Sequence, residues 1–270
     1  MTADLHTHST ASDGQYSPTQ LVRLAKERGL DVLALTDHDT VDGLEEAVRA
    51  GEQMGIRVIR GIELSAREYP TFHILGYGFD PEAPALSDLC RELKEGRDQR
   101  APRIIAFLEE QGVRIPLSEV EALAGGQIMG RPHFAQVLVR HGYVSSNREA
   151  FDRYLDTEDF HRRVERPKPL AQVCMETIRA AGGKASLAHP YQIGVDNGTL
   201  EDIIRELASC GLNAIECFYP RHTPEQQSFY LRLAEKYGLH ATGGSDFHGE
   251  RVKPDIRLAA WELETDWFLE

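Results

Sequence analysis

Short apolar runs alternate with amphipathic segments along most of the chain. The N-terminal part has strand-like runs at 3–8, 31–39, 56–64 and 71–79, and segments of helical periodicity at 17–29 and 42–54. The first helical segment begins with a Ser17 cap and the Gln20 of a capping box, and Gly29 ends it. This part of the chain therefore predicts an alternation of strands and helices.

The alternation resumes in the C-terminal part. Helical segments at 169–181, 199–210 and 223–237 separate strand-like runs at 184–190, 213–219 and 240–248, and a last run lies at 256–263. Strands that alternate with helices in this way predict an α/β fold with a parallel sheet and helices outside it. Seven or eight such strands favour a closed (β/α) barrel, with an open doubly wound sheet as the alternative.

The middle of the chain interrupts this pattern. Residues 82–168 show mostly helical periodicity. We therefore predict a helical insertion at 101–166 that is carried on a loop of a barrel formed by residues 1–100 and 167–270.

Composition limits the classes of function. The formal net charge of −13 makes duplex nucleic acid an unfavourable partner, although bound metal ions can reverse the local sign for a small anion. Cys90, Cys174, Cys210 and Cys217 have no zinc-knuckle or redox spacing and read as free thiols. The N-terminus lacks a signal-peptide pattern, and no run approaches a membrane span, so we expect a cytoplasmic protein without a membrane partner.

Polar side chains with metal-binding chemistry follow the strand-like runs. The set comprises His6, His8, Asp13, His38, Glu63, His73, His189, Asp246 and His248. Because the carboxyl ends of barrel strands meet at one rim, we expect these side chains to converge there. A single histidine at a strand end is usually an ordinary polar residue, but nine such residues favour a cluster of two or three metal ions. His73 fits least well, because it comes early in its run.

Five motifs resemble the successive motifs of the PHP (polymerase and histidinol phosphatase) family. They read DLHTHSTASDG, LTDHDT, GIELS, LAHP and GGSDFHG, and they extend from residue 4 to about residue 250. The segments GRPHFAQVLV, LAHPY and TGGSDFHG resemble the branch of nucleoside 3′,5′-bisphosphate phosphatases and 5′-to-3′ RNA-trimming enzymes. The resemblance implies a distorted (β/α)7 barrel, the PHP fold, that holds a trinuclear centre.

The resemblance also implies how the ligands are shared. His6, His8, Glu63 and Asp246 would hold one ion; Glu63, His73 and His189 a second; Asp13, His38 and His248 a third. Three Mn²⁺ ions are expected, with Fe²⁺ or Zn²⁺ as alternatives. The expected nucleophile is a hydroxide that bridges two ions and attacks phosphorus. His38, His248 and Asp246 are the candidate catalytic residues, and His38, His248 or a metal-bound water would supply the proton for the leaving group.

Arginines are the candidates for phosphate contacts away from the metals. Arg97, Arg100 and Arg103 recur every three residues, which places them on one helical face. We select Arg100, Arg131 at a predicted helix start, and the pair Arg221 and His222 beyond a strand, together with His38 and His248 at the metals. Arg100 and Arg131 would grip a second phosphate beneath the helical insertion.

The expected substrate is a small nucleotide, with short 5′-phosphorylated single-stranded RNA as a further substrate. Removal of the 3′-phosphate of a nucleoside 3′,5′-bisphosphate is the preferred activity. Histidinol-phosphate phosphatase is the alternative enzyme, and a non-catalytic PHP module that docks on a polymerase is the alternative of another class. The sequence does not predict the oligomeric state.

Overall fold

A computed structural model describes residues 1–268. It contains an eight-stranded sheet in the order β7-β6-β5-β4-β3-β2-β1-β8. The strands are β1 (Thr2–Thr7), β2 (Val32–Leu35), β3 (Arg57–Ser65), β4 (His73–Tyr77), β5 (Lys184–Leu187), β6 (Ala214–Phe218), β7 (His240–Gly243) and β8 (Trp261–Glu262). The α/β barrel predicted from the sequence is confirmed.

The sheet curls until its two sides meet. Beyond β7, Phe247 forms a parallel bridge with Thr7, and the Asp246 amide donates to the His6 carbonyl at 2.8 Å. The barrel is therefore nearly closed by the segment that follows β7. Inside it, the Tyr77 hydroxyl donates to the Leu5 carbonyl at 2.8 Å.

Strand β4 departs from the predicted parallel sheet. It runs antiparallel to both β3 and β5, and Ser65 at the end of β3 faces His73 at the start of β4. The last strand, β8, is also antiparallel to β1 and is shorter than the predicted run at 256–263. Because β4 is reversed, its first residue lies at the same rim as the ends of the parallel strands, which accounts for the position of His73.

Helices cover the outside of the barrel. They are α1 (Pro18–Glu27), α2 (Leu44–Met54), α8 (Ala171–Ala180), α9 (Asn197–Ser209) and α10 (Pro224–Tyr237), with short 3₁₀ turns η2 (Pro190–Ile193) and η3 (Asp266–Phe268). The expected capping box is present at α1, where Ser17 and Gln20 exchange hydrogen bonds. Buried residues such as Leu21, Ile62 and Ile204 join these helices to the outer face of the sheet in one apolar core.

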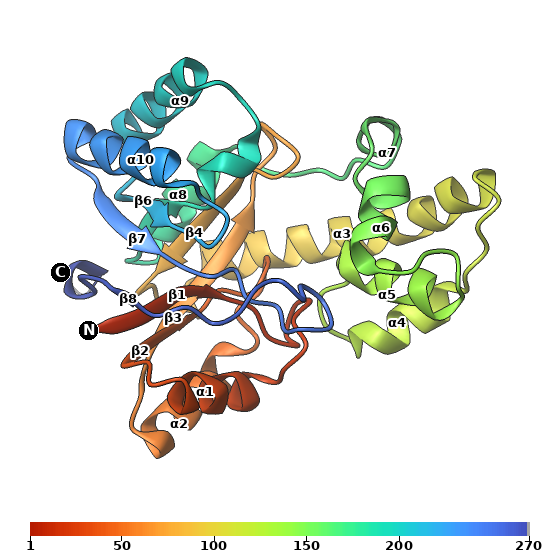
Figure 1. Cartoon of the computed structure of the whole chain (residues 1–270), viewed down its shortest axis with the longest axis horizontal. Helices are drawn as coiled ribbons and strands as arrows, with labels where there is room; N and C mark the ends of the chain where they lie inside the picture. Colours follow the sequence, from red (N-terminus) through yellow and green to blue (C-terminus); the bar gives the residue numbers. More distant parts are fainter. Residues whose placement is uncertain (269–270) are drawn as a thin grey trace.

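The long helix α3 (Pro84–Glu110) leads away from the barrel to a separate group of helices. This group contains α4 (Leu117–Ala124), α5 (Arg131–Arg140), α6 (Asn147–Ala150), the π-helical turn η1 (Phe151–Leu155) and α7 (Glu158–Arg163). Figure 1 shows these helices beside the barrel, with α3 passing between the two parts. They have their own core around Phe107, Phe134 and Phe160. Within residues 1–268, no helix is long and apolar enough to span a bilayer.

Candidate active site

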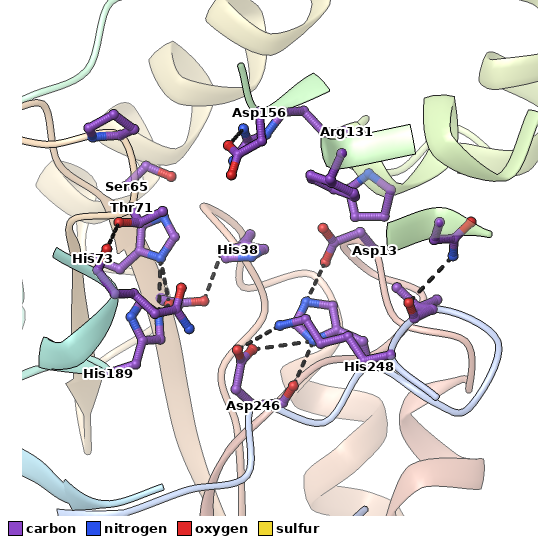
Figure 2. A pocket seen from close by; sticks show the side chains of 18 of the residues that line it. Asp13, His38, Ser65, Thr71, His73, Arg131, Asp156, His189, Asp246 and His248 are labelled. Carbon is purple, nitrogen blue, oxygen red and sulfur yellow. Dashed lines mark hydrogen bonds and ion pairs between the residues drawn. The ribbon is translucent and has the colours of Figure 1, made fainter. Parts of the chain in front are cut away.

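The predicted polar residues come together at one end of the barrel. His6 and His8 lie at the end of β1, Glu63 lies in β3, and His189 follows β5. Asp13, His38, Glu63, His73, His189, Asp246 and His248 line one large pocket. Figure 2 shows His73 and His189 on one side of His38, with Asp13, Asp246 and His248 on the other.

Glu63 lies at the centre of this arrangement. Its Oε2 atom is 3.2 Å from His6 Nε2, 3.3 Å from His8 Nε2 and 2.9 Å from His38 Nδ1. Its Oε1 atom is 2.8 Å from His73 Nδ1 and 2.9 Å from His189 Nε2. One buried carboxylate therefore faces two separate groups of imidazoles, as a bridging ligand would.

Three overlapping groups have donor atoms within 4.8 Å of one another: His6, His8, Glu63 and Asp246; His8, Asp13, His38 and His248; and His38, Glu63 and His73. His189 joins the last group, with its Nε2 atom 3.4 Å from His73 Nδ1. The structure thus brings together all nine residues that the sequence selected. The group of His6, His8, Glu63 and Asp246 is the set expected for one ion. The other two groups differ from the expected sets, because one also includes His8 and the other includes His38.

Several atoms in these groups are buried and have no hydrogen-bond partner within residues 1–268. They are His6 Nε2, both ring nitrogens of His8, His38 Nδ1, Glu63 Oε2 and His189 Nδ1. Burying an unpaired polar atom is costly, so such atoms are rare in folded proteins unless something else satisfies them. Burial also lowers the pKa of His73 to about 3, which keeps its imidazole neutral, as metal ligation requires. The residues therefore fit divalent metal ions.

The backbone is strained at three points on the rim. Asp39 (φ 56°), His189 (φ 23°) and Asp246 (φ 56°) adopt positive φ angles although none is glycine. Such conformations cost about 1–3 kcal/mol and concentrate at functional sites. Each follows the carboxyl end of a strand, where the strained backbone turns the side chain toward its partners.

Glu216, which sequence reasoning missed, supports two residues of the rim. Its Oε1 atom is 3.0 Å from His6 Nδ1, and its Oε2 atom accepts the His189 amide at 2.7 Å. Such a contact fixes the ring of His6 and leaves its Nε2 atom directed toward Glu63. A glutamate within the apolar strand β6 was the sequence signal for this role.

Substituting Glu216→Gln is expected to weaken metal binding by about 10- to 100-fold, because the amide supports the His6 ring less strongly than the carboxylate. Metal titration followed by elemental analysis measures this effect. The same titration on Glu235→Gln, an exposed position in α10, provides the control. Equal metal affinity in Glu216→Gln and the wild type would contradict the role of Glu216.

Two carboxylates that follow β2, Asp37 and Asp39, support the rim through hydrogen bonds and do not belong to its metal-binding groups. Asp37 accepts hydrogen bonds from the Ser9 amide, the Ser9 hydroxyl and the Ser12 hydroxyl, and so fixes the loop that carries Asp13. Asp39 accepts two bonds from Ser65.

Asp39 also connects the rim to the helical insertion. Its Oδ2 atom accepts from Arg97 at 2.6 Å and from Arg166 at 2.8 Å. Burial alone would raise the pKa of Asp39, but these two guanidinium groups hold it well below its usual range. Sequence reasoning did not predict the ion pair between Asp39 and Arg166, because the two residues are 127 positions apart.

The pocket has a volume of about 1450 Å³ and lies between the rim and the helical insertion. Outside the metal-binding groups, arginines and lysines outnumber carboxylates in its lining, although the whole chain is acidic. The cations are Arg67, Arg97, Arg100, Arg131, Arg148, Arg166, Lys168, Arg221, Arg251 and Lys253, and the carboxylates are Glu68, Asp152, Asp156, Glu165 and Asp255. This excess of positive charge suits a phosphorylated ligand. Figure 2 shows Arg131 and Asp156 across the pocket from the rim.

Of the residues predicted to bind phosphate away from the metals, three line the pocket and one does not. Arg100, Arg131 and Arg221 line the pocket. Arg131 contacts the Asp156 carboxylate and donates to the Leu155 carbonyl at 3.0 Å. His222 lies outside the pocket lining, where its Nδ1 atom is 2.9 Å from the Cys217 carbonyl.

The three arginines of α3 do not share one face, contrary to the expectation from their spacing. Arg97 is buried against Asp39, Arg100 is partly buried, and Arg103 is exposed. Each three-residue step turns about 300°, so positions six residues apart differ by roughly 120° around the helix.

The start of α5 lies directly against the rim. A Cβ atom at Gly130 would be 2.9 Å from Asp13 Oδ2, so glycine allows this close approach. His133 Nδ1 accepts the Gly130 amide at 3.0 Å and caps the helix. The GRPHF motif therefore brings the helical insertion against Asp13.

A barrel whose rim gathers imidazoles and carboxylates beneath a basic pocket defines the class of metal-dependent hydrolases that act on phosphate esters. The comparison with known families agrees with this class. Residues 4–159 match the PHP domain, and the chain belongs to this family.

Curated relatives match nearly the whole chain. A 5′-3′ exoribonuclease of Haemophilus influenzae is 38% identical over 91% of this chain and 89% of its own length. A 3′,5′-nucleoside bisphosphate phosphatase of Chromobacterium violaceum is 34% identical over 91% of this chain and 86% of its own. A phosphoribosyl 1,2-cyclic phosphate 1,2-diphosphodiesterase of Eggerthella lenta is 34% identical over 93% and 95%.

Solved structures have the same fold. A protein of Bifidobacterium adolescentis described as a metal-dependent phosphoesterase has a TM-score of 0.87 and is 29% identical, over 99% of this chain and 93% of its own. An amidohydrolase of Chromobacterium violaceum has a TM-score of 0.88 at 32% identity, over 98% and 94%. The protein is therefore a metal-dependent phosphoesterase of the PHP family and an enzyme, rather than a non-catalytic docking module.

Proposed function

We propose that the protein removes the 3′-phosphate from nucleoside 3′,5′-bisphosphates, and that it also trims short 5′-phosphorylated RNA. The observation that carries this proposal is the single pocket in which a metal-binding rim faces a wall of arginines. A ligand with two phosphates uses both walls, whereas a simple monophosphate uses one. Two of the curated relatives act on these classes of substrate.

The nine rim residues would hold three divalent ions, for which Mn²⁺ is our choice over Fe²⁺ or Zn²⁺. When bound, the ions supply charge neutralisation at phosphorus and a nucleophile at neutral pH. The chain itself orients the ester. His38 is the candidate for moving the proton to the leaving hydroxyl, because its ring borders the pocket with 13% of the side chain exposed.

The helical insertion at 101–166 would act as a lid over the rim. It contributes Arg131, Phe151 and Phe160 to the pocket lining, and Gly130 lies against Asp13. Such a roof excludes water and limits the site to a small ligand or a single-stranded end. It also disfavours histidinol phosphate, which has one phosphate and a cationic amine that the basic lining would repel.

A substrate panel tests this proposal. Metal-loaded protein is incubated with adenosine 3′,5′-bisphosphate, 3′-AMP, 5′-AMP, histidinol phosphate, a 1,2-cyclic phosphate of ribose 5-phosphate and a short 5′-phosphorylated RNA. We expect kcat/KM for the bisphosphate to exceed that for 3′-AMP by at least about tenfold, because the second phosphate gains charge-assisted hydrogen bonds. Equal turnover of the two would count against the proposal, and a preference for the cyclic ester would replace it.

A further inference from the structure

Five cationic side chains gather in the wall of the pocket between the barrel and the helical insertion: Arg97, Arg100, Arg131, Arg166 and Lys168. Two carboxylates pair with members of this group. Asp39 accepts from Arg97 and Arg166, and Asp156 contacts Arg131. The group therefore carries more positive charge than its contacting carboxylates neutralise.

Arg100 and Arg166 have donors that find no partner. Arg100 Nε and Arg166 Nη1 are buried without a hydrogen-bond acceptor among residues 1–268. The side chain of Arg166 is only 4% exposed. In the described part of the chain, the acceptors of Lys168 Nζ are the backbone carbonyls of Tyr69 at 3.3 Å and Pro70 at 3.5 Å.

Such a cluster is costly in the absence of an anion. Burial lowers the pKa of Arg100, and the neighbouring Arg97, Arg166 and Arg131 lower it further. Burial also lowers the pKa of Lys168 to about 8, with Arg166 adding to the effect. Arginine keeps its proton under almost all conditions, so the repulsion persists until an anion enters.

We propose that Arg100 and Arg166, with Lys168 beside them, form an anion subsite for the phosphate monoester that is not being hydrolysed. This inference rests on the proposed function and assigns the second phosphate to a particular place. It also replaces Arg131 by Arg166 as the partner of Arg100. Within the described chain, Arg166 keeps the unpartnered Nη1 donor in addition to its pairing with Asp39, whereas Arg131 has no such buried donor and pairs with Asp156. A phosphate dianion matches the unpaired charge, and its oxygens suit the planar fork of arginine.

The test compares Arg100→Gln with Arg103→Gln, an exposed arginine one turn further along α3. Adenosine 3′,5′-bisphosphate and 3′-AMP share the 3′-phosphate and differ only in the 5′-phosphate. Arg100→Gln should lower kcat/KM for the bisphosphate by about 10- to 100-fold and change it for 3′-AMP by less than about threefold. Arg103→Gln should leave both values unchanged, and Arg100→Lys should retain part of the preference.

Other results would overturn the subsite. Equal losses for the two substrates would place the effect of Arg100 at the metals or in the fold, and no loss would remove Arg100 from the subsite. A loss confined to short 5′-phosphorylated RNA would assign the position to a phosphodiester instead of a monoester.

A binding measurement separates this inference from the proposed function. Calorimetry with metal-loaded protein gives the Kd of 5′-AMP, with adenosine as the ligand without phosphate. Arg100→Gln should weaken 5′-AMP at least about tenfold and leave adenosine unchanged, even if wild-type protein does not hydrolyse the bisphosphate. Unchanged 5′-AMP binding in Arg100→Gln would contradict the subsite while leaving the proposed function intact.

Discussion

Substituting Glu63→Gln is expected to remove most of the bound metal and nearly all phosphatase activity. The carboxylate contacts the imidazoles of His6, His8 and His38 through Oε2 and those of His73 and His189 through Oε1. An amide offers only one oxygen acceptor and no charge, so it cannot bridge two cations. Removing a hydrogen-bond partner of a metal ligand lowers activity by up to roughly 100-fold. Because Glu63 would itself be a ligand, its loss should lower activity by more than this.

The measurement combines elemental analysis of the purified variant with kcat on the preferred substrate. Glu165→Gln is the matched control, because Glu165 also lines the pocket but is exposed and outside the metal-binding groups. It should keep its metal and its activity. A Glu63→Gln protein with full metal content and near-normal kcat would refute the bridging role.

Substituting Gly244→Ala is expected to damage both stability and the active site. A Cβ atom at this position would lie 2.1 Å from His6 Cβ, 2.6 Å from the His6 nitrogen and 2.8 Å from Glu216 Oε1. These atoms belong to the seam where the segment after β7 closes on β1, so backbone would have to move. We expect a loss of about 3 kcal/mol or more in the free energy of unfolding, at the upper end of overpacking effects.

Urea denaturation and metal analysis together measure this effect. Gly96→Ala is the matched control, because Gly96 lies inside helix α3 and its Cβ atom would make an ordinary contact, at 3.6 Å, with the Pro167 carbonyl oxygen. Alanine is favoured over glycine inside a helix by about 1 kcal/mol, so this variant should be neutral or slightly stabilised. If Gly244→Ala unfolds at the same urea concentration as the wild type and retains its metal, the seam accommodates the added methyl group and the expectation is wrong.

The two halves of the molecule depend on each other at Asp39. Its carboxylate accepts hydrogen bonds from Arg97 in α3, from Arg166 in the segment that follows α7, and from Ser65 in β3. Both connections between the barrel and the helical insertion are thereby attached to Asp39, the residue that follows His38. This arrangement explains why a strained backbone is kept at Asp39.

Local sequence patterns were sufficient to locate most elements. The Ser17 capping box, the strand ends at His6 and His189, and the helical middle of the chain all appear in the structure near their predicted places. Capping and hydrophobic periodicity involve neighbouring residues, so they can be read without knowing the fold. The direction of β4 could not be read in this way, because apolar periodicity is the same in parallel and antiparallel strands.

The sequence by itself determined the chemistry at the rim. Histidines and acids at the ends of successive runs implied one metal-binding site, since barrel topology brings those ends together. The structure alone decided what surrounds that site. Glu216 supports His6 across 210 residues, and Arg166 reaches Asp39 across 127. Such pairings depend on which segments the folded chain places side by side, and no periodicity along the sequence records them.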